Sequence, residues 1–157
     1  GITYGYHRYF SHKSYKASPM IEIWLLYLGL LCGGRSVLTW SGVHRMHHAY
    51  SDTDRDPHCR NNNAWYVILF SMWRVESIPR KFVKDLLRNP RVMFFHRYGI
   101  YILGAHWIIT FLTFGWNAVI INTMLIVLSY LGLGLLNCLV RNFRVPRKNL
   151  WINLLAP

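Results

Sequence analysis

The sequence predicts an all-α integral membrane protein: a helical hairpin at about 98–114 and 118–140, interfacial segments, and a cytoplasmic cap that carries two histidine boxes. No Lys, Arg, Asp or Glu occurs between Tyr98 and Val140. The composition is 53% hydrophobic, yet the formal net charge is +12, since 18 Lys and Arg stand against 6 Asp and Glu. The basic residues alternate with long apolar segments. Five histidines are gathered in two short boxes, HRYFSH and HRMHH. The charge alone would suggest nucleic acid binding, but the uncharged hairpin argues against that class of partner.

The hairpin is expected to turn at Gly115-Trp116-Asn117, between two apolar stretches of roughly the 20 residues that a membrane crossing requires. The turn has no base, whereas bases flank both ends of the hairpin: Arg91 and Arg97 before it, and Arg141, Arg144, Arg147 and Lys148 after it. Because cytoplasmic loops are enriched in Lys and Arg, we expect the turn on the outer side and both flanks in the cytoplasm.

The segment between the two boxes, Met20 to Cys32, is apolar but shorter than the roughly 20 residues of a full crossing. Two boxes that serve one metal centre must lie on the same side of the membrane. We therefore predict a shallow re-entrant or interfacial hairpin that turns near Gly33-Gly34-Arg35. An ordinary single span is the alternative only if the two boxes are unrelated.

A chain of 157 residues is long enough for one domain. It begins at Gly1 rather than Met and ends on an apolar run, so we expect it to be part of a longer protein. Residues 1–60 hold the boxes, 98–140 the hairpin and 141–157 the start of a cytoplasmic C-terminal part. Residues 61–97 form a basic region that either rests on an anionic membrane surface or is simply solvated. Three scattered cysteines give no disulfide framework, which suits a reducing cytoplasmic side.

The histidine boxes indicate a metal site. On a helix, His44, His47 and His48 share a face, whereas His7 and His12 lie about 140° apart on a regular helix. The latter pair suits a frayed helix end or two neighbouring ions. Imidazoles suit iron, copper, zinc or nickel, and the lack of an HExxH motif or cysteine pairs disfavours a zinc peptidase or zinc finger. His96 and His106 are expected not to be ligands, although His106, for which the sequence shows no partner, is a weak functional candidate within the hairpin.

The stretches GITYGYHRYFSHKSYK and WSGVHRMHHAYSDTDRDPH resemble the first two histidine boxes of membrane fatty acyl desaturases, the delta-9 type in particular. The resemblance covers most of the chain, but only the first sixty residues are specific to the motif. It implies two iron ions on the cytoplasmic side, with ligands at His7, His12, His44, His47 and His48. A third HxxHH box would be expected just after Pro157, and without it we expect this chain alone to be inactive.

The resemblance also implies residues that support the ligands. Asp52, Asp54 and Asp56 are interpreted as carboxylates that orient imidazole N–H groups, or alternatively as turn formers. His58 belongs to the signature without being a primary ligand. Asn137 matches the Asn of the family's Asn-x-x-x-His element, but Arg141 stands at the position of its His, which departs from the usual ligand set.

The implied activity is desaturation of a long-chain fatty acyl thioester or acyl lipid, with dioxygen as co-substrate and a b-type cytochrome or ferredoxin as electron donor. The bases from Arg74 to Arg97 would attract an acidic donor or the phosphate of a CoA thioester. A membrane hydroxylase or alkane monooxygenase with similar boxes is the nearest alternative, and the DTDRDPH segment favours desaturation over it. A non-catalytic metal-binding or transport membrane protein is the alternative from another class.

Overall fold

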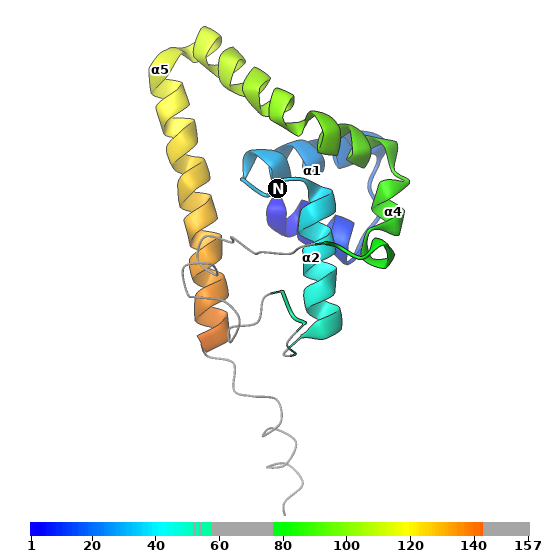
Figure 1. Cartoon of the computed structure of the whole chain (residues 1–157). Helices are drawn as coiled ribbons and strands as arrows, with labels where there is room; N and C mark the ends of the chain where they lie inside the picture. The colour runs from blue at the N-terminus through cyan, green and yellow to red at the C-terminus, as the bar shows by residue number, and fades with distance from the viewer. Residues whose placement is uncertain (52, 54, 58–76, 143–157) are drawn as a thin grey trace, which may run out of the picture.

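The computed structural model describes residues 1–51, 53, 55–57 and 77–142, and only the backbone of residues 133 and 136–142. All regular elements within these ranges are helices and none is a strand, as predicted. The elements are η1 (Ile2–Ser11), α1 (Pro19–Leu31), α2 (Val37–Tyr50), η3 (Arg80–Phe82), α4 (Lys84–Leu87) and α5 (Pro90–Asn142). In Figure 1, η1, α1 and α2 form a compact group beside the two arms of α5.

The predicted hairpin corresponds to α5, which is interrupted at Gly115. There the backbone has φ 74° and ψ −173°, a conformation that glycine adopts without steric cost, and the second arm turns back from the first (Figure 1). The turn thus lies at the position predicted from the sequence. Pro90–Gly132 is long and apolar enough to cross a membrane, and its most apolar window has a mean hydropathy of 1.8 with none of it buried inside the protein.

The first arm begins eight residues earlier than predicted, at Pro90 instead of about residue 98. Proline suits the first position of a helix, and the Asn89 side-chain oxygen accepts hydrogen bonds from the Arg91 and Val92 amides at 3.0 and 3.3 Å. The cap stabilises the helix start although the first turns contain bases. The basic region predicted at 61–97 is therefore helical at its end, whereas residues 61–76 lie outside the described part.

The segment between the boxes folds into α1 and a tight reversal. Ser18 caps α1, and its hydroxyl accepts from the Ile21 amide at 3.4 Å. The 13 residues of α1 rise only about 20 Å, less than the roughly 30 Å of a bilayer core. Gly33 and Arg35 have positive φ values of 75° and 55°, and Ser36 then caps α2. The chain thus turns at residues 33–35, as predicted, and α2 then packs against η1. That this segment is re-entrant or interfacial in a membrane stays a prediction.

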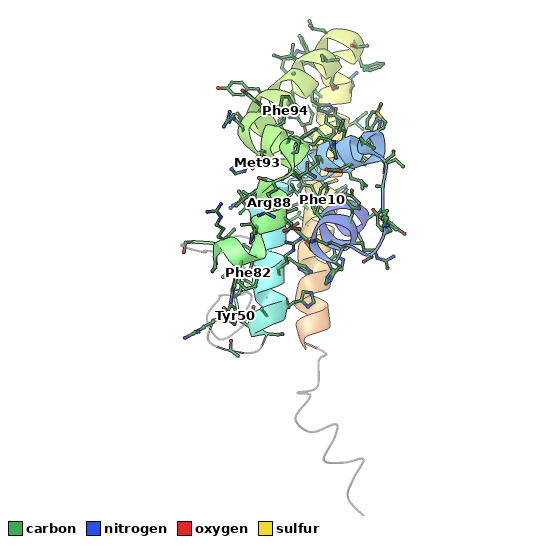
Figure 2. The ribbon with its side chains drawn as sticks, turned by 90° about the vertical axis from the view of Figure 1, so that its right-hand side faces the viewer. Phe10, Tyr50, Phe82, Arg88, Met93 and Phe94 are labelled. Carbon is green, nitrogen blue, oxygen red and sulfur yellow. The ribbon has the colours of Figure 1, made fainter. Side chains whose placement is uncertain are left out.

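A small core holds these helices together. Its buried members come from η1, α1, α2, α4 and the start of α5: Tyr6, Phe10, Leu26, Val37, Leu86 and Val92. Figure 2 shows the side chains of η3, α4 and early α5 in sequence, from Phe82, above Tyr50, up to Phe94. The Phe82 and Tyr50 rings lie 5.9 Å apart. The core thus fixes η1 against α2, the two elements that carry the boxes.

A buried carboxylate joins α1 to the start of α5. Glu22 is only 3% exposed and accepts hydrogen bonds from Asn89 at 2.5 Å, Arg91 at 3.1 Å and Tyr9 at 3.2 Å. A buried charge is tolerated when it is paired and hydrogen-bonded in this way. Arg91 is therefore an internal partner, whereas Arg80, Lys84, Arg88 and Arg97 of the same region are exposed.

Candidate metal centre

The first box lies on η1, which is a π-helix and not an α-helix. In a π-helix the hydrogen bonds join residues five apart, and here the His12 amide donates to the His7 carbonyl oxygen at 3.1 Å. Residue 12 consequently lies one widened turn after residue 7, on the same side. The two imidazole rings are 4.6 Å apart. The separation of about 140° between His7 and His12 holds for a regular α-helix. It does not hold for η1, because η1 is a π-helix with a wider turn.

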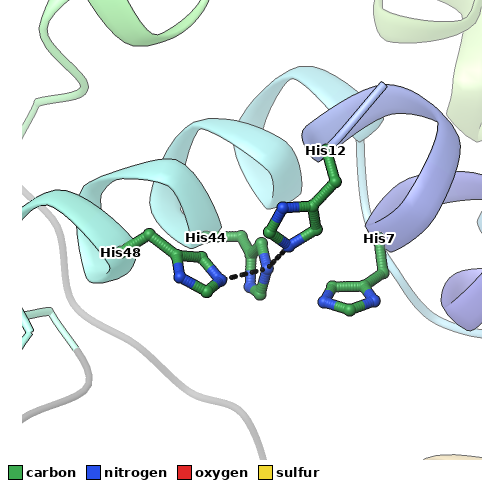
Figure 3. Close-up of side chains that lie close together, drawn as sticks. All are labelled: His7, His12, His44 and His48. Atoms are coloured by element: carbon green, nitrogen blue, oxygen red, sulfur yellow. Dashed lines mark hydrogen bonds between the residues drawn. The ribbon is translucent and has the colours of Figure 1, made fainter. Parts of the chain in front are cut away.

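The second box lies on the last two turns of α2, where His44 and His48 are one turn apart. The Nε2 atoms of His12 and His44 are 3.0 Å apart, and those of His48 and His44 are 3.1 Å apart (Figure 3). The rings of His7 and His44 are 4.6 Å apart. One nitrogen from each of His7, His12, His44 and His48 can be chosen so that all four lie within 4.8 Å of one another.

These distances fit a metal ion held by nitrogen ligands. Two nitrogens, each about 2.0–2.1 Å from one ion, are separated by about 3 Å when they subtend a right angle and by about 3.4 Å at a tetrahedral angle. The observed separations of 3.0 and 3.1 Å are of the size expected between nitrogen ligands of one ion. The donor set consists of imidazoles, which suit iron as well as copper, zinc or nickel.

His47 is directed differently from the other four histidines. Its Nδ1 lies 2.8 Å from the Asp56 carboxylate, and Asp56 is 4% exposed. The rings of His47 and His44 are 6.4 Å apart. A carboxylate on one imidazole nitrogen fixes the tautomer and leaves the other nitrogen to act as a ligand. Asp56 thus has the orienting contact proposed for it, whereas Asp52, Asp54 and His58 lie outside the described residues, as does the side chain of Asn137.

The surroundings of His7 favour its neutral form. Burial lowers the pKa of His7, and the neighbouring His12, His48 and Arg8 lower it further. A metal ligand must be unprotonated, so a lowered pKa favours binding at neutral pH. The Trp40 ring stacks on His44 at 5.0 Å with an angle of 20° between the planes and covers one side of that ligand.

Arg45, between two histidines of the second box, holds the two boxes together. Its guanidinium donates to the carbonyl oxygens of Phe10, Ser11 and Phe82 at 2.5, 3.2 and 2.7 Å. It also forms two hydrogen bonds to the Asp85 carboxylate, at 2.7 and 3.0 Å. Neither Arg45 nor Trp40 was predicted from the sequence to have a role at the site. The spacing of four between Trp40 and His44 was a signal for the ring contact, whereas no local pattern indicated the contacts of Arg45.

The two histidines expected not to be ligands have other partners. His96 Nδ1 lies 2.7 Å from the Ser36 hydroxyl. His106, for which the sequence showed no partner, bonds to Tyr27 and Asn122, each at 2.8 Å. Neither residue belongs to the four-histidine group found among the described residues.

Comparison with known proteins agrees with the resemblance. The family model described as "Fatty acid desaturase" matches residues 1–152. The sn-1 stearoyl-lipid 9-desaturase of Anabaena variabilis is 33% identical over 124 residues, which cover 76% of this chain and 45% of that protein. The probable acyl-CoA desaturase of Schizosaccharomyces pombe is 42% identical over 101 residues, 62% of this chain and 21% of that protein.

Delta-9 acyl-lipid desaturase 1 of Arabidopsis thaliana is 36% identical over 106 residues, 64% of this chain and 35% of that protein. The chain thus spans less than half the length of each of these relatives. No solved structure gives a significant match. Because the family model covers nearly the whole chain, the chain belongs to the fatty acid desaturase family.

Proposed function

We propose that this chain forms the part of an oxygen-dependent fatty acyl desaturase that carries its first two histidine boxes. The observation that supports this most directly is the convergence of four imidazoles from two segments that are about thirty residues apart in the sequence. Two iron ions, when bound by His7, His12, His44, His47 and His48, would supply the redox chemistry with dioxygen that removes two hydrogens from adjacent methylenes.

The residues of the chain have separate tasks in this proposal. The π-helix places the first two imidazoles side by side, and α2 supplies the others. The Asp56 carboxylate accepts a hydrogen bond from the Nδ1–H group of His47 and so orients the imidazole ring. Trp40 keeps water from one side of His44. Arg45 fixes the carbonyls of Phe10 and Ser11, directly before His12, against α2.

The proposed substrate is a long-chain fatty acyl thioester or acyl lipid, with a cis double bond introduced at the delta-9 position. The names of the relatives from Anabaena and Arabidopsis support this position, whereas relatives from Spodoptera littoralis and Trichoplusia ni are named as acyl-CoA Delta(11) desaturases. The long apolar α5, with most of its large side chains exposed, suits a location in the membrane among lipids. The histidine boxes would then face the cytoplasm, the side on which the bases lie.

An electron donor, either a b-type cytochrome or a ferredoxin, would dock on the basic surface of η3 and α4. Exposed bases there attract an acidic protein and raise its association rate. Reversing the charges of Lys84 and Arg88 should slow reduction by such a donor and weaken the salt dependence of the rate. Unchanged rates at both low and high salt would refute this docking surface.

Metal binding by the chain tests the proposed site. The purified chain in lipid nanodiscs is titrated with Co²⁺, whose visible spectrum reports nitrogen ligation, and with Fe²⁺. His12→Ala should weaken binding of both ions, whereas the control His96→Ala, a hydrogen-bonded histidine outside the cluster, should leave binding unchanged. Equal effects of the two variants would refute the assignment of ligands.

Product analysis of the complete protein tests the reaction. Expression in a host that lacks its own desaturase should give monounsaturated fatty acids. An alcohol would instead favour the membrane hydroxylase alternative. Metal binding without any consumption of dioxygen would favour the non-catalytic alternative.

A further inference from the structure

Three polar side chains meet where α1 and both arms of α5 come together. His106 on the first arm has its Nδ1 2.8 Å from the Tyr27 hydroxyl of α1, and its Nε2 2.8 Å from the Asn122 amide nitrogen of the second arm. Both ring nitrogens are therefore hydrogen-bonded. One bond joins the first arm to α1, and the other joins the two arms of α5. These residues lie in or against a stretch without any Lys, Arg, Asp or Glu.

The hydrogen-bond chemistry of the three groups is complementary. An amide N–H of Asn122 donates to Nε2, which makes Nδ1 the protonated nitrogen of a neutral imidazole and the Tyr27 oxygen its acceptor. With the amide turned over, the same contacts form with the opposite tautomer. In either arrangement the imidazole is satisfied without a charge, which suits an apolar environment.

Most of the large apolar side chains of the second arm are exposed, among them Trp116 at 67%, Met124 at 60% and Leu128 at 65%. Among the described residues, its other contacts include two through aromatic rings. The Trp116 ring lies 4.7 Å from the Phe111 ring of the first arm, and the Tyr130 ring lies 3.2 Å from where a Cβ of Gly33 would be. Dispersion contacts of this kind allow a helix to slide, whereas two directional hydrogen bonds define one position.

The orientation of this arm bears on the metal centre. Tyr130 contacts the α1–α2 turn at Gly33, and the next residue, Gly34, receives the ring of Tyr6, the neighbour of His7. In Figure 1 the second arm ends at about the level of the end of α2, the part that carries the second histidine box.

We propose that Tyr27, His106 and Asn122 are positioning residues that hold the second arm of α5 against α1 and the first arm in one orientation relative to the histidine cluster. Their catalytic consequence rests on the proposed desaturase function, whereas their effect on the arm does not. The interaction is a polar network specific to these three positions, because the hairpin residues next to it, such as Thr110 and Thr123, bond only within their own helix.

Distance measurements between spin labels test the effect on the arm. Labels are placed at exposed positions in a chain whose three cysteines are replaced by serine: Met20 on α1, Ile108 on the first arm and Leu128 on the second. In nanodiscs, the Met20–Leu128 pair should give one narrow distance distribution. Asn122→Leu and His106→Leu should broaden it, while Asn122→Leu leaves the Met20–Ile108 distribution narrow. Thr123→Val, the matched control beside Asn122, should change neither.

Several results would overturn the inference. One is a Met20–Leu128 distance distribution that stays narrow in both Asn122→Leu and His106→Leu. Another is a Thr123→Val variant whose distribution broadens as much as theirs. His106→Gln retains a donor and an acceptor and should keep the narrow distribution. Broadening equal to that of His106→Leu would mean that ring volume, and not hydrogen bonding, positions the arm. If His106→Leu aggregates, Asn122→Leu removes the same bond from the other side.

Turnover by the complete protein tests the catalytic consequence. Asn122→Leu should lower kcat at unchanged iron content by about tenfold or more, since a misplacement of about 1 Å can cost about 10²-fold. Altered distances with unchanged kcat would overturn the catalytic role. Absence of desaturation in the unmodified complete protein would instead refute the proposed function and leave the distance result intact.

Discussion

At the scale of single residues, Tyr6 shows how one side chain positions the histidine cluster. It is 1% exposed, and its hydroxyl donates toward the carbonyl oxygens of Leu26 and Arg35 at 3.4 and 3.1 Å. Burial, with a smaller contribution from Cys32, raises the pKa of Tyr6 and keeps the hydroxyl protonated as a donor. The ring fits between Gly29 and Gly34. Since His7 is the next residue, this fit fixes the start of the first box.

The fit of Tyr6 predicts that Gly29→Ala destabilises the chain. A Cβ at Gly29 would overlap the Tyr6 ring, and the surrounding core leaves the ring no room to move. Overpacking of this kind costs about 1–3 kcal/mol, to be measured by thermal unfolding in detergent. The control is Gly104→Ala on α5, where no atom lies within 4 Å of the added carbon. A Gly29→Ala variant as stable as Gly104→Ala would show that the ring is not confined.

The contact between Asp56 and His47 predicts a loss of metal affinity in Asp56→Asn. Loss of the carboxylate removes the charge that holds the His47 tautomer, and such supporting changes typically lower metal affinity about 10–100-fold. Titration with Co²⁺ measures the change. Thr53→Val, which removes a hydroxyl bond to the Tyr50 carbonyl in the same loop, is the control and should bind normally. Equal affinity of Asp56→Asn and the unmodified chain would contradict this role.

At the scale of elements, Arg45 and Asp85 join η1, α2 and α4. Lys13, directly after the first box, adds an ion pair to Asp85 at 2.9 Å. Burial by itself would raise the pKa of Asp85, but the hydrogen bonds and charges of Arg45 and Lys13 more than offset it and hold the pKa well below its usual range. The Asp85 carboxylate is thus charged at neutral pH.

This lowered pKa predicts how Asp85→Asn changes the pH dependence of stability. A carboxylate with a lower pKa in the folded state contributes stability above the unfolded value of about 3.9 and loses it as the pH falls toward the folded value. We therefore expect Asp85→Asn to be less stable than the unmodified chain at neutral pH, with the difference shrinking below about pH 4. Thermal unfolding of both proteins across this range checks it. A constant difference would mean that the ion pair is not its source.

Element by element, the sequence was most informative where the pattern was long. The uncharged run from Tyr98 to Val140 and the turn sequence Gly115-Trp116-Asn117 predicted the two arms and their turn. The reversal at residues 33–35 followed from the shortness of the apolar segment before it. The π-helix could not be predicted, because its hydrogen bonds depend on packing against α1 and α2 and not on a local propensity. For the same reason, the spacing of His7 and His12 was interpreted with the wrong helical period.

At the scale of the whole molecule, charge and apolar surface are separated. Each acidic side chain that the structure describes has a basic partner. Glu22 pairs with Arg91, Asp56 with His47, and Asp85 with both Arg45 and Lys13. The exposed charges of the described residues are consequently basic. Those on or directly after η3 and α4 are Arg80, Lys81, Lys84 and Arg88, and the others are Arg8, Lys13, Lys16, Arg35, Arg55 and Arg97. The exposed apolar residues gather on α1 and α5. This division suits a chain with α5 in the membrane and the cluster in basic surroundings at the surface.

The same division predicts the orientation in the membrane. The Gly115 turn has no base, whereas η3, α4 and the start of α5 are basic, so the turn should face outward and α4 inward. In a cysteine-free background, the Asn117→Cys variant should react with a membrane-impermeant maleimide on intact cells. The Ser77→Cys variant, exposed just before η3, should react only after permeabilisation. Labelling of both from outside would exclude a spanning hairpin with a cytoplasmic cap. Labelling of Ser77→Cys alone would invert the orientation and place the histidine cluster on the outer side, away from any cytoplasmic electron donor.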